Sequence, residues 1–218
     1  KMVNDLLTDK VDKLNTFNYT VSHDLSAPLS SAFNFLDLLQ GPAGKASPSR
    51  SQQLLNSLRG ALTHMKEMTE GVSLYLKADK MELRTEVVAP EKAVADVFSH
   101  LKYHYPDHLK SYTFTVHSPL PEIRVDPLLF RQAMTNLLSN AVKATRSTDH
   151  PRIQVTGRTT DQAVIITIKD NGIGIPPQNR DRLFELFKSA HPREQFPGTG
   201  AGLAIVKRII ERHGGTIQ

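Results

Sequence analysis

A heptad-like spacing of apolar residues runs through the first eighty residues and constrains the fold more than any other feature of the sequence. Apolar positions recur every three or four residues, which is the period of a helix that buries one face. One run extends from Leu7 to Leu39 and a second from Leu55 to Leu76, and the stretch GPAGKASPS at 41–49 separates them. The pattern therefore predicts a hairpin of two long helices.

The two runs form the expected seam of this hairpin. The first consists of Leu7, Val11, Leu14, Asn18, Val21, Leu25, Pro28, Ala32, Phe35 and Leu39, and the second of Leu55, Leu58, Leu62, Met65, Thr69, Val72 and Leu76. Asn18 is either a polar residue that sets the register or a tolerated polar position. Two lone helices bury too little apolar surface to be stable, so we expect a homodimer in which two hairpins form a four-helix bundle.

After residue 80 the pattern changes to short stretches in which polar and apolar residues alternate. Strand-like stretches lie at 83–88, 112–117, 152–157 and 163–170, and helical patterns lie around 90–103, 127–145 and 202–213. We therefore expect an α+β chain, with a helical hairpin over 1–79 and an α/β sandwich over 80–218.

The composition excludes several classes of protein. The absence of Cys among 218 residues rules out disulfides, thiolate zinc sites and a cysteine nucleophile, and it is typical of a reducing compartment, so we expect a cytoplasmic location. No run of about 18 apolar residues occurs, so we expect no membrane contact in this stretch. The net charge of +5 is scattered. It favours an anionic partner such as a nucleotide, and no basic face typical of nucleic-acid binding is visible.

His23 is the first candidate for chemistry. If Val21 and Leu25 lie on the seam, a helical wheel places His23 on the opposite, solvent-facing side. Asp24 can accept the proton of ring Nδ1, which leaves Nε2 as the nucleophile. Pro28 cannot donate to the carbonyl of Asp24, so we expect the helix to bend or loosen beside the histidine. These features suit a phosphoacceptor. A solvated histidine on a polar helix face is the alternative.

Asn136, Asn140 and Lys143 form a second candidate group. The two amides lie four residues apart on one helical face, and the lysine follows on the same side. Amide oxygens and an ammonium group suit a polyphosphate that carries Mg²⁺. An ordinary solvated helix face would show the same residues.

Two glycine clusters form a third candidate group. In IKDNGIGIP an apolar stretch leads into Asp170, and Gly172 and Gly174 follow it, so a backbone that can approach a ligand lies beside a carboxylate. In GTGAGLAIVKRI the glycines at 198, 200 and 202 precede an amphipathic helix whose N-terminal amides can receive phosphate. The span FELFKSAHPREQFP between the clusters is typical of a mobile lid. Simple turns are the alternative for each cluster.

Together these segments resemble the sensor histidine kinases of two-component signalling, over nearly the whole chain. FNYTVSHDLSAPL is similar to the H box of that family, TNLLSNAVKAT to its N box, DNGIGIP to its G1 box, LFELF to its F box and GTGAGLAIVKRIIERHGG to its G2 box, in the family's order. The resemblance implies a dimerisation and histidine-phosphotransfer hairpin, followed by an ATP-binding sandwich of the fold shared by gyrase, chaperone and kinase ATPases.

The resemblance also implies roles for single residues. His23 would accept the γ-phosphoryl group of ATP, with Asp24 as base or orienting partner, and would pass the group to an aspartate of a response regulator. Asn140 would hold Mg²⁺, and Asn136 and Lys143 would contact the polyphosphate. The protein would supply mainly positioning and charge neutralisation for an in-line transfer.

For the adenine, the resemblance implies that Asp170 accepts from the exocyclic amine and that Gly172 and Gly174 permit the close approach. The edge of the lid would be formed by Gly198, Gly200, Gly202 and Leu203. The resemblance also implies an upstream sensor domain in the parent chain. The family continues with a last β-hairpin where this sequence ends in GGTIQ, so we expect either a sequence that stops short or a sheet without that edge.

Four positions depart from the family pattern. Ser26 replaces a common Arg, and Ala27 replaces the Thr or Asn that orients water for phosphatase activity, so we expect weak phosphatase activity. Ala144 replaces a frequent aromatic residue and Ala201 the usual Leu, which predicts a looser pocket. These departures keep open a catalytically weak dimeric scaffold that docks a response regulator. An ATPase of the chaperone or topoisomerase kind is another alternative, but it would need no H box.

Overall fold

The computed structural model describes the backbone of residues 2–42, 47–80, 82–104, 111–192, 195–196 and 198–218, and their side chains except at 2–10, 12–14, 16, 78–80 and 104. Contacts divide the chain into two compact units, residues 1–73 and 74–218. Each unit is described by itself. Among the described residues, no helix combines the length and apolar character needed to cross a bilayer.

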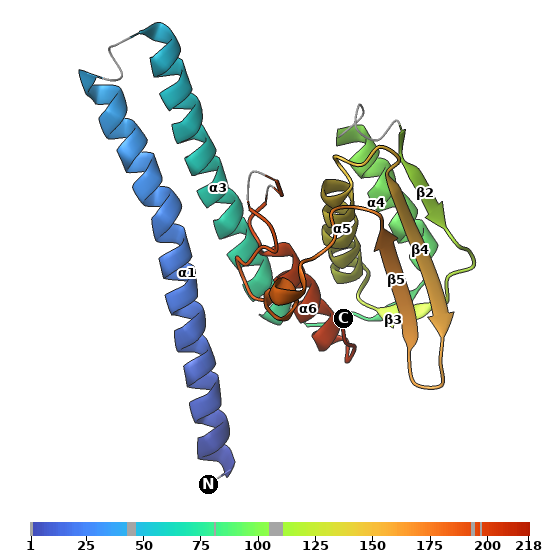
Figure 1. The fold of residues 1–218 in the computed structure, drawn as a ribbon. Coiled ribbons are helices and arrows are strands. Elements are labelled where there is room, and N and C mark those ends of the chain that lie inside the picture. Colours follow the sequence, from blue (N-terminus) through green and yellow to red (C-terminus); the bar gives the residue numbers. More distant parts are fainter. Residues whose placement is uncertain (1, 43–46, 81, 105–110, 193–194, 197) are drawn as a thin grey trace. The chain divides into compact units, whose positions relative to one another are not determined.

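The first unit is built from two long helices, α1 (Met2–Gln40) and α3 (Pro48–Lys80), as Figure 1 shows. The predicted hairpin is therefore confirmed. Within the separating stretch, residues 43–46 lie outside the described residues. The domain boundary expected at 79/80 falls in the last turn of α3, and it stays a prediction.

Burial along the hairpin follows the predicted seam in part. Ala32, Leu54 and Met68 are at most 5% exposed. The second run divides into two stripes: Leu58, Met65 and Val72 are half-buried, whereas other members lie exposed on the outside. Helix α1 covers only one side of α3. The apolar stripe of α3 is wide enough to contact two helices, so part of it stays exposed in the single hairpin.

The first run shows the same division. Val21, Leu25 and Phe35 are half-buried, while Asn18 is exposed and Phe17 takes the half-buried position beside it. Asn18 is thus not buried within the single hairpin, and its seam position in the expected dimer stays a prediction. The side chains of Leu7 and Leu14 lie outside the described residues.

The second unit contains two small sheets. Strands β1 (Glu86–Val88) and β3 (Ile123–Val125) pair antiparallel. In the other sheet β4 (Arg152–Thr159) is central: it runs parallel to β2 (Thr113–Val116) and antiparallel to β5 (Val164–Asp170). The register places Asp170, the last residue of β5, opposite Ile153 near the start of β4.

Among the described residues of this unit, the end of α3 is followed by α4 (Pro90–His104), α5 (Pro127–Ala144) and α6 (Gly202–Arg212), and a short 3₁₀ helix, η2 (Pro177–Arg182), precedes α6. Helix α5 packs against both α4 and α6. The core between helices and sheet is almost fully buried at Val94, Leu138, Ile153, Val155, Val206 and Ile209. The predicted α/β unit after the hairpin is confirmed.

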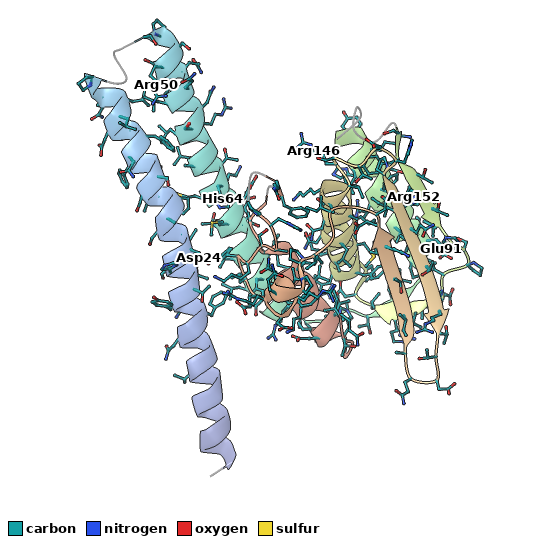
Figure 2. All side chains as sticks on the ribbon, in the orientation of Figure 1. Asp24, Arg50, His64, Glu91, Arg146 and Arg152 are labelled. Carbon is teal, nitrogen blue, oxygen red and sulfur yellow. The ribbon has the colours of Figure 1, made fainter. Side chains whose placement is uncertain are left out.

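Polar side chains fix how the elements begin. Asp126 caps α5, and Pro127 at its first position needs no hydrogen-bond acceptor for a backbone amide. Glu91, labelled in Figure 2, accepts the backbone N–H of Leu120 from its place at the start of α4. These contacts hold the loops around α4 and α5, the helix that carries the N-box residues.

Candidate active site

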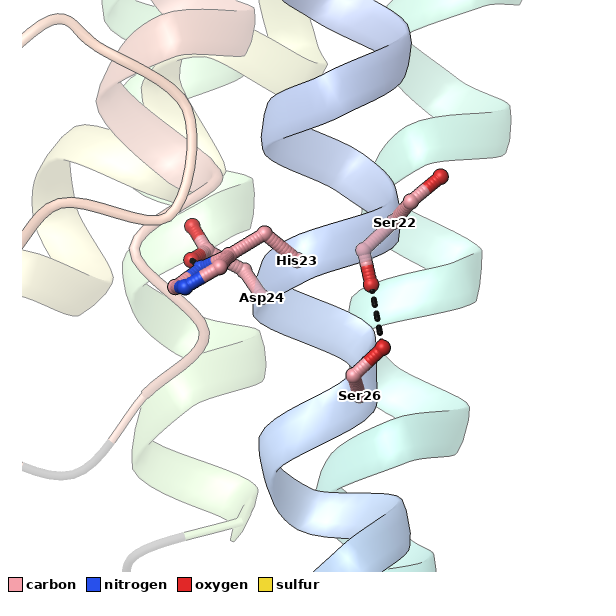
Figure 3. Close-up of polar contacts among 4 residues, drawn as sticks. All are labelled: Ser22, His23, Asp24 and Ser26. Atoms are coloured by element: carbon pink, nitrogen blue, oxygen red, sulfur yellow. Dashed lines mark hydrogen bonds and ion pairs between the residues drawn. The ribbon is translucent and has the colours of Figure 1, made fainter.

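His23 lies on an exposed face of α1. Its side chain is 69% exposed, whereas the flanking seam residues Val21 and Leu25 are half-buried. Ring Nδ1 lies 2.9 Å from Oδ1 of Asp24, whose side chain is 20% exposed. Figure 3 shows both side chains projecting from the same side of the helix. With the Nδ1 proton donated to Asp24, Nε2 keeps its lone pair on a side chain that is largely exposed.

The helix continues without interruption through Pro28. Two serine hydroxyls donate to carbonyls one turn earlier: Ser26 to Ser22 at 2.7 Å, drawn in Figure 3, and Ser31 to Ala27 at 3.1 Å. Such back-bonding is known to bend helices slightly. The bend expected beside His23 stays a prediction, and so does the effect of Ser26 in place of arginine.

In the second unit, α5 brings the N-box residues beside the G2 segment. Nδ2 of Asn136 donates to the carbonyl of Gly202 at 3.4 Å. A Cβ added to Gly198 would lie 3.4 Å from Nζ of Lys143. Asn140 lies on α5 one turn after Asn136, and all three polar side chains are partly buried. The structure therefore brings together residues that are about sixty positions apart in sequence.

The start of α6 offers hydrogen-bond donors in the same place. In the part of the chain that the structure describes, no side chain caps α6 at Ala201. The first amides of a helix lack acceptors within the helix, and together with the helix dipole they favour an anion. Leu203, the second residue of α6, is partly buried. The Lys143 ammonium group and the first amides of α6 form a donor set that would fit a polyphosphate, with the amide groups of Asn136 and Asn140 beside them.

The G1 segment meets the other end of α5. A Cβ on Gly172 would lie 2.4 Å from the carbonyl oxygen of Ala144, so only glycine fits this close approach. The Ile173 amide donates to the same oxygen at 3.1 Å. Oδ1 of Asp170 accepts the N–H of Gly172 at 2.9 Å, and Asp170 is exposed. The carboxylate thus lies at the end of β5, beside the last turn of α5.

Several contacts tie the described part of the segment predicted as a lid to its flanking residues, and its mobility stays a prediction. The amide of Phe187 donates to the carbonyl of Gly200 at 3.1 Å, and ring Nε2 of His191 lies 2.7 Å from the carbonyl oxygen of Gly174. Asn179 donates to the carbonyl of Ala190 at 2.7 Å. Residues 193–194 and 197 of the predicted lid lie outside the described residues. In the described part, Phe187 of the F box contacts the second glycine cluster, and His191 contacts the first.

Two polar residues that sequence reasoning missed hold the frame of the site. Asn171 binds the start of β4: its Oδ1 accepts from the Arg152 amide at 2.7 Å, and its Nδ2 donates to the His150 carbonyl at 2.9 Å. His213 accepts the Asp126 N–H on Nε2 at 2.9 Å, and its Nδ1 lies 2.7 Å from the carbonyl oxygen of Ile209. The Asp-Pro pair at 126–127 was a readable helix-start signal, but its histidine partner is 87 residues away.

The carboxylate of Asp126 is surrounded by hydrogen-bond donors. Three backbone amides donate to its carboxylate at 3.1 Å, those of Leu128, Leu129 and Arg84. Burial opposes ionisation and raises the pKa of Asp126, but the amide donors and the electrostatic interaction with His213 outweigh burial and hold the pKa below its ordinary value. Asp126 therefore stays ionised and links the N-terminus of α5 to the end of α6.

The other residues that depart from the family pattern differ in their burial and in their neighbours. Ala27 is exposed on α1. Ala201 is 1% exposed and belongs to the hydrophobic core of the second unit. Ala144 lies in contact range of Gly172 at the end of α5. The looser pocket expected from Ala144 and Ala201 stays a prediction.

Comparison with known proteins gives consistent matches. Residues 125–218 match the family model of histidine kinase-, DNA gyrase B-, and HSP90-like ATPases. The chain is 31% identical over 205 residues to cyanobacterial phytochrome A of Nostoc sp., with 94% of this chain and 26% of that protein covered. It is 33% identical over 206 residues to the adaptive-response sensory kinase SasA of Synechocystis sp., with 90% and 53% covered. The chain thus spans between about a quarter and about half of these relatives.

A solved structure of histidine kinase ThkA in complex with response regulator protein TrrA has the same fold, with a TM-score of 0.70 at 17% identity over 95% of this chain and 57% of that one. The helical hairpin with its exposed His23, the ATPase-family unit with its N, G1, F and G2 segments around α5, and these relatives agree. The chain therefore belongs to the sensor histidine kinases and comprises their catalytic core.

Proposed function

We propose that this chain transfers the γ-phosphoryl group of ATP to Nε2 of His23 and then to an aspartate of a response regulator. The observation that carries the proposal is the imidazole itself: it is 69% exposed, and its Nδ1 lies 2.9 Å from the Asp24 carboxylate. An imidazole whose Nδ1 proton is held by a carboxylate has Nε2 available as nucleophile. Asp24 orients the ring and stabilises the positive charge that develops on it.

The donor set around α5 supports ATP as the phosphoryl source. Lys143 and the uncapped start of α6 would contact the phosphates, and Asn136, which donates to the Gly202 carbonyl, would hold the two elements in register. Asp170 would accept from the adenine amine at the end of β5. These groups act by orientation and by neutralising charge, since phosphoryl transfer needs little covalent chemistry from the protein.

Asn140 would supply an oxygen ligand to Mg²⁺. This ion is usually held by one or two protein groups together with substrate phosphates and water, so a single amide on the phosphate-facing side of α5 suits it. When bound, Mg²⁺ neutralises charge on the phosphate oxygens.

The exposed stripe of the hairpin supports a homodimer. Leu55, Leu62 and Leu76 on α3 are 40–51% exposed, and Leu29, Phe33 and Leu36 on α1 are 39–56% exposed. Rows of exposed apolar side chains at helical spacing are typical of an interface. A second hairpin against these faces would complete the four-helix bundle.

A response regulator is the proposed acceptor of the phosphoryl group. The similar structure of ThkA contains the response regulator protein TrrA. The exposed Ala27 lacks the hydroxyl or amide that would orient water, so we propose weak phosphatase activity toward that partner. The sensor domain expected upstream would act on the hairpin.

The experiment that tests the proposal is incubation with γ-labelled ATP and Mg²⁺. We expect label that is acid-labile and alkali-stable, lost in His23→Gln and retained in His117→Gln, which changes an exposed histidine on the other unit. Label that survives in His23→Gln would overturn the assignment of the acceptor.

A second experiment distinguishes an active kinase from a catalytically weak scaffold. Asp170→Asn keeps an oxygen for the Gly172 amide but loses the charge, and we expect its affinity for Mg-ATP to fall about tenfold or more. Binding of Mg-ATP without any labelling of the wild-type chain would favour the weak scaffold over the kinase.

A further inference from the structure

Tyr19 lies one turn before His23 on α1, and the two rings stack. Their centroids are 6.1 Å apart and their planes meet at 25°. Residues four apart on a helix lie one above the other, so this contact is set by the spacing of the two side chains. A centroid distance of 4.5–7 Å is the range in which aromatic rings attract one another.

The ring of Tyr19 does not pack in the hairpin interior. Tyr19 is 73% exposed, more than any described apolar side chain of the seam. An exposed tyrosine gains little from burial, so its contact with the histidine ring is the main interaction that the described structure gives it. The same imidazole is also held by Asp24, whose carboxylate lies 2.9 Å from Nδ1.

These two contacts restrain different motions of the imidazole. The Asp24 carboxylate holds one ring nitrogen and so limits rotation within the ring plane. The Tyr19 ring lies beside the imidazole in an offset, near-parallel arrangement and so limits the tilt of that plane. With both restraints, Nε2 points in one direction from α1 instead of sweeping over the rotamers of an exposed histidine.

We propose that Tyr19 is a positioning residue that holds the His23 imidazole ready for phosphoryl transfer. This inference rests on the proposed role of His23 as phosphoacceptor. Alignment of the nucleophile before reaction lowers the barrier because less rotational freedom is lost in the transition state. Since a ring pair of this kind contributes a factor of about two to ten, we expect Tyr19→Leu to slow phosphorylation of His23 by about two- to tenfold.

The test compares Tyr19→Leu with Tyr19→Phe in the full chain. Phenylalanine keeps the ring and loses only the hydroxyl, so it should retain the wild-type rate. Tyr103→Leu is the matched control, because Tyr103 is an 81% exposed tyrosine on α4. The first readout is the NMR signals of the His23 ring protons, which carry a ring-current shift when an aromatic ring lies beside them. We expect this shift in the wild type and in Tyr19→Phe, and its loss in Tyr19→Leu.

The second readout is the rate of phosphorylation with two donors, Mg-ATP and phosphoramidate. In the latter reaction the lone pair of Nε2 forms the bond to phosphorus while the P–N bond of the donor breaks, and the donor nitrogen, which is already protonated, leaves as ammonia. We expect Tyr19→Leu to lower the rate with both donors, with an unchanged KM for ATP, because the nucleophile and not the nucleotide site is disturbed.

The outcomes separate this inference from the proposed function. A wild-type chain that reacts with phosphoramidate but not with Mg-ATP would contradict the kinase proposal, while the effect of Tyr19→Leu on the phosphoramidate rate still decides the role of Tyr19. Three results would overturn that role: His23 ring-proton shifts that are the same in the wild type and in Tyr19→Leu, a Tyr19→Leu rate equal to that of Tyr103→Leu, or a Tyr19→Phe rate as low as that of Tyr19→Leu.

Discussion

Gly200 occupies a place in the second unit that no other residue fits. Its φ is +71°, in the left-handed region, and a Cβ there would lie 2.5 Å from the carbonyl carbon of Phe187 and 2.8 Å from the carbonyl oxygen of Lys188. Its own carbonyl accepts the Phe187 amide. The contact is backbone to backbone, so no side chain can move aside. A single glycine therefore couples the F box to the segment that leads into α6.

Gly200→Ala tests this coupling against Gly214→Ala. Gly214 has a φ of +74° but no atom within 4 Å of the added Cβ, so its substitution carries only the backbone strain of about 1 kcal/mol. Gly200→Ala adds a steric clash, and we expect a loss of at least about 2 kcal/mol in the free energy of unfolding. Urea denaturation followed by circular dichroism measures both. Equal losses in the two variants would contradict the account of Gly200.

At the scale of elements, sequence patterns predicted most of the fold. The helices at 90–103, 127–145 and 202–213 and the strands at 112–117, 152–157 and 163–170 occur within a few residues of their predicted bounds. Strand β3 was missed because three residues are too few to show alternation, and its pairing with β1 is a tertiary contact.

The candidate residues were readable from the sequence, but their mutual placement was not. Lys143 and Gly198, or Asn136 and Gly202, meet only because α5 and α6 pack together. The anchors Asn171 and His213 escaped prediction for the same reason, since each bonds backbone groups that are distant in sequence. Local patterns indicate which residues can carry chemistry, whereas packing decides which of them meet.

The capping of the N-terminus of α5 by Asp126 leads to a testable prediction. Asp126→Ala removes the acceptor for three amides, and we expect a loss of about 2 kcal/mol and faster hydrogen exchange at the amides of Leu128 and Leu129. Thr148→Ala, at a partly buried position beyond the end of α5, serves as control. Unchanged exchange at these amides would contradict the capping role.

Asp126 also makes the stability of the folded chain depend on pH. The folded state holds the pKa of Asp126 below its unfolded value, so the unfolded state binds the proton more readily. The stabilisation is complete above about pH 4 and is lost as pH falls through the folded pKa. We therefore expect Asp126→Asn to flatten the decline of stability below about pH 4, measured by urea denaturation at a series of pH values. A decline identical to that of the wild type would contradict this assignment.

For the whole molecule, we expect two hairpins to associate into a dimer. Leu62 is 51% exposed on the stripe of α3, and its neighbour Thr63 is also exposed but polar. We expect Leu62→Lys to shift the chain from dimer to monomer, because a charge cannot be buried unpaired in an apolar interface, whereas Thr63→Lys should leave the dimer intact. Sedimentation equilibrium distinguishes these states. A wild-type monomer, or a Leu62→Lys dimer of unchanged affinity, would contradict the proposed bundle.

We propose that the phosphoryl group resides on Nε2 of His23, since Nδ1 lies against Asp24. The most direct measurement is phosphorus NMR of the chain after incubation with Mg-ATP, because the two phosphohistidine isomers give separate signals. We predict the Nε2 isomer in the wild type and in His117→Gln, and no phosphohistidine signal in His23→Gln. A signal from the Nδ1 isomer, or a phosphohistidine signal that persists in His23→Gln, would contradict the account.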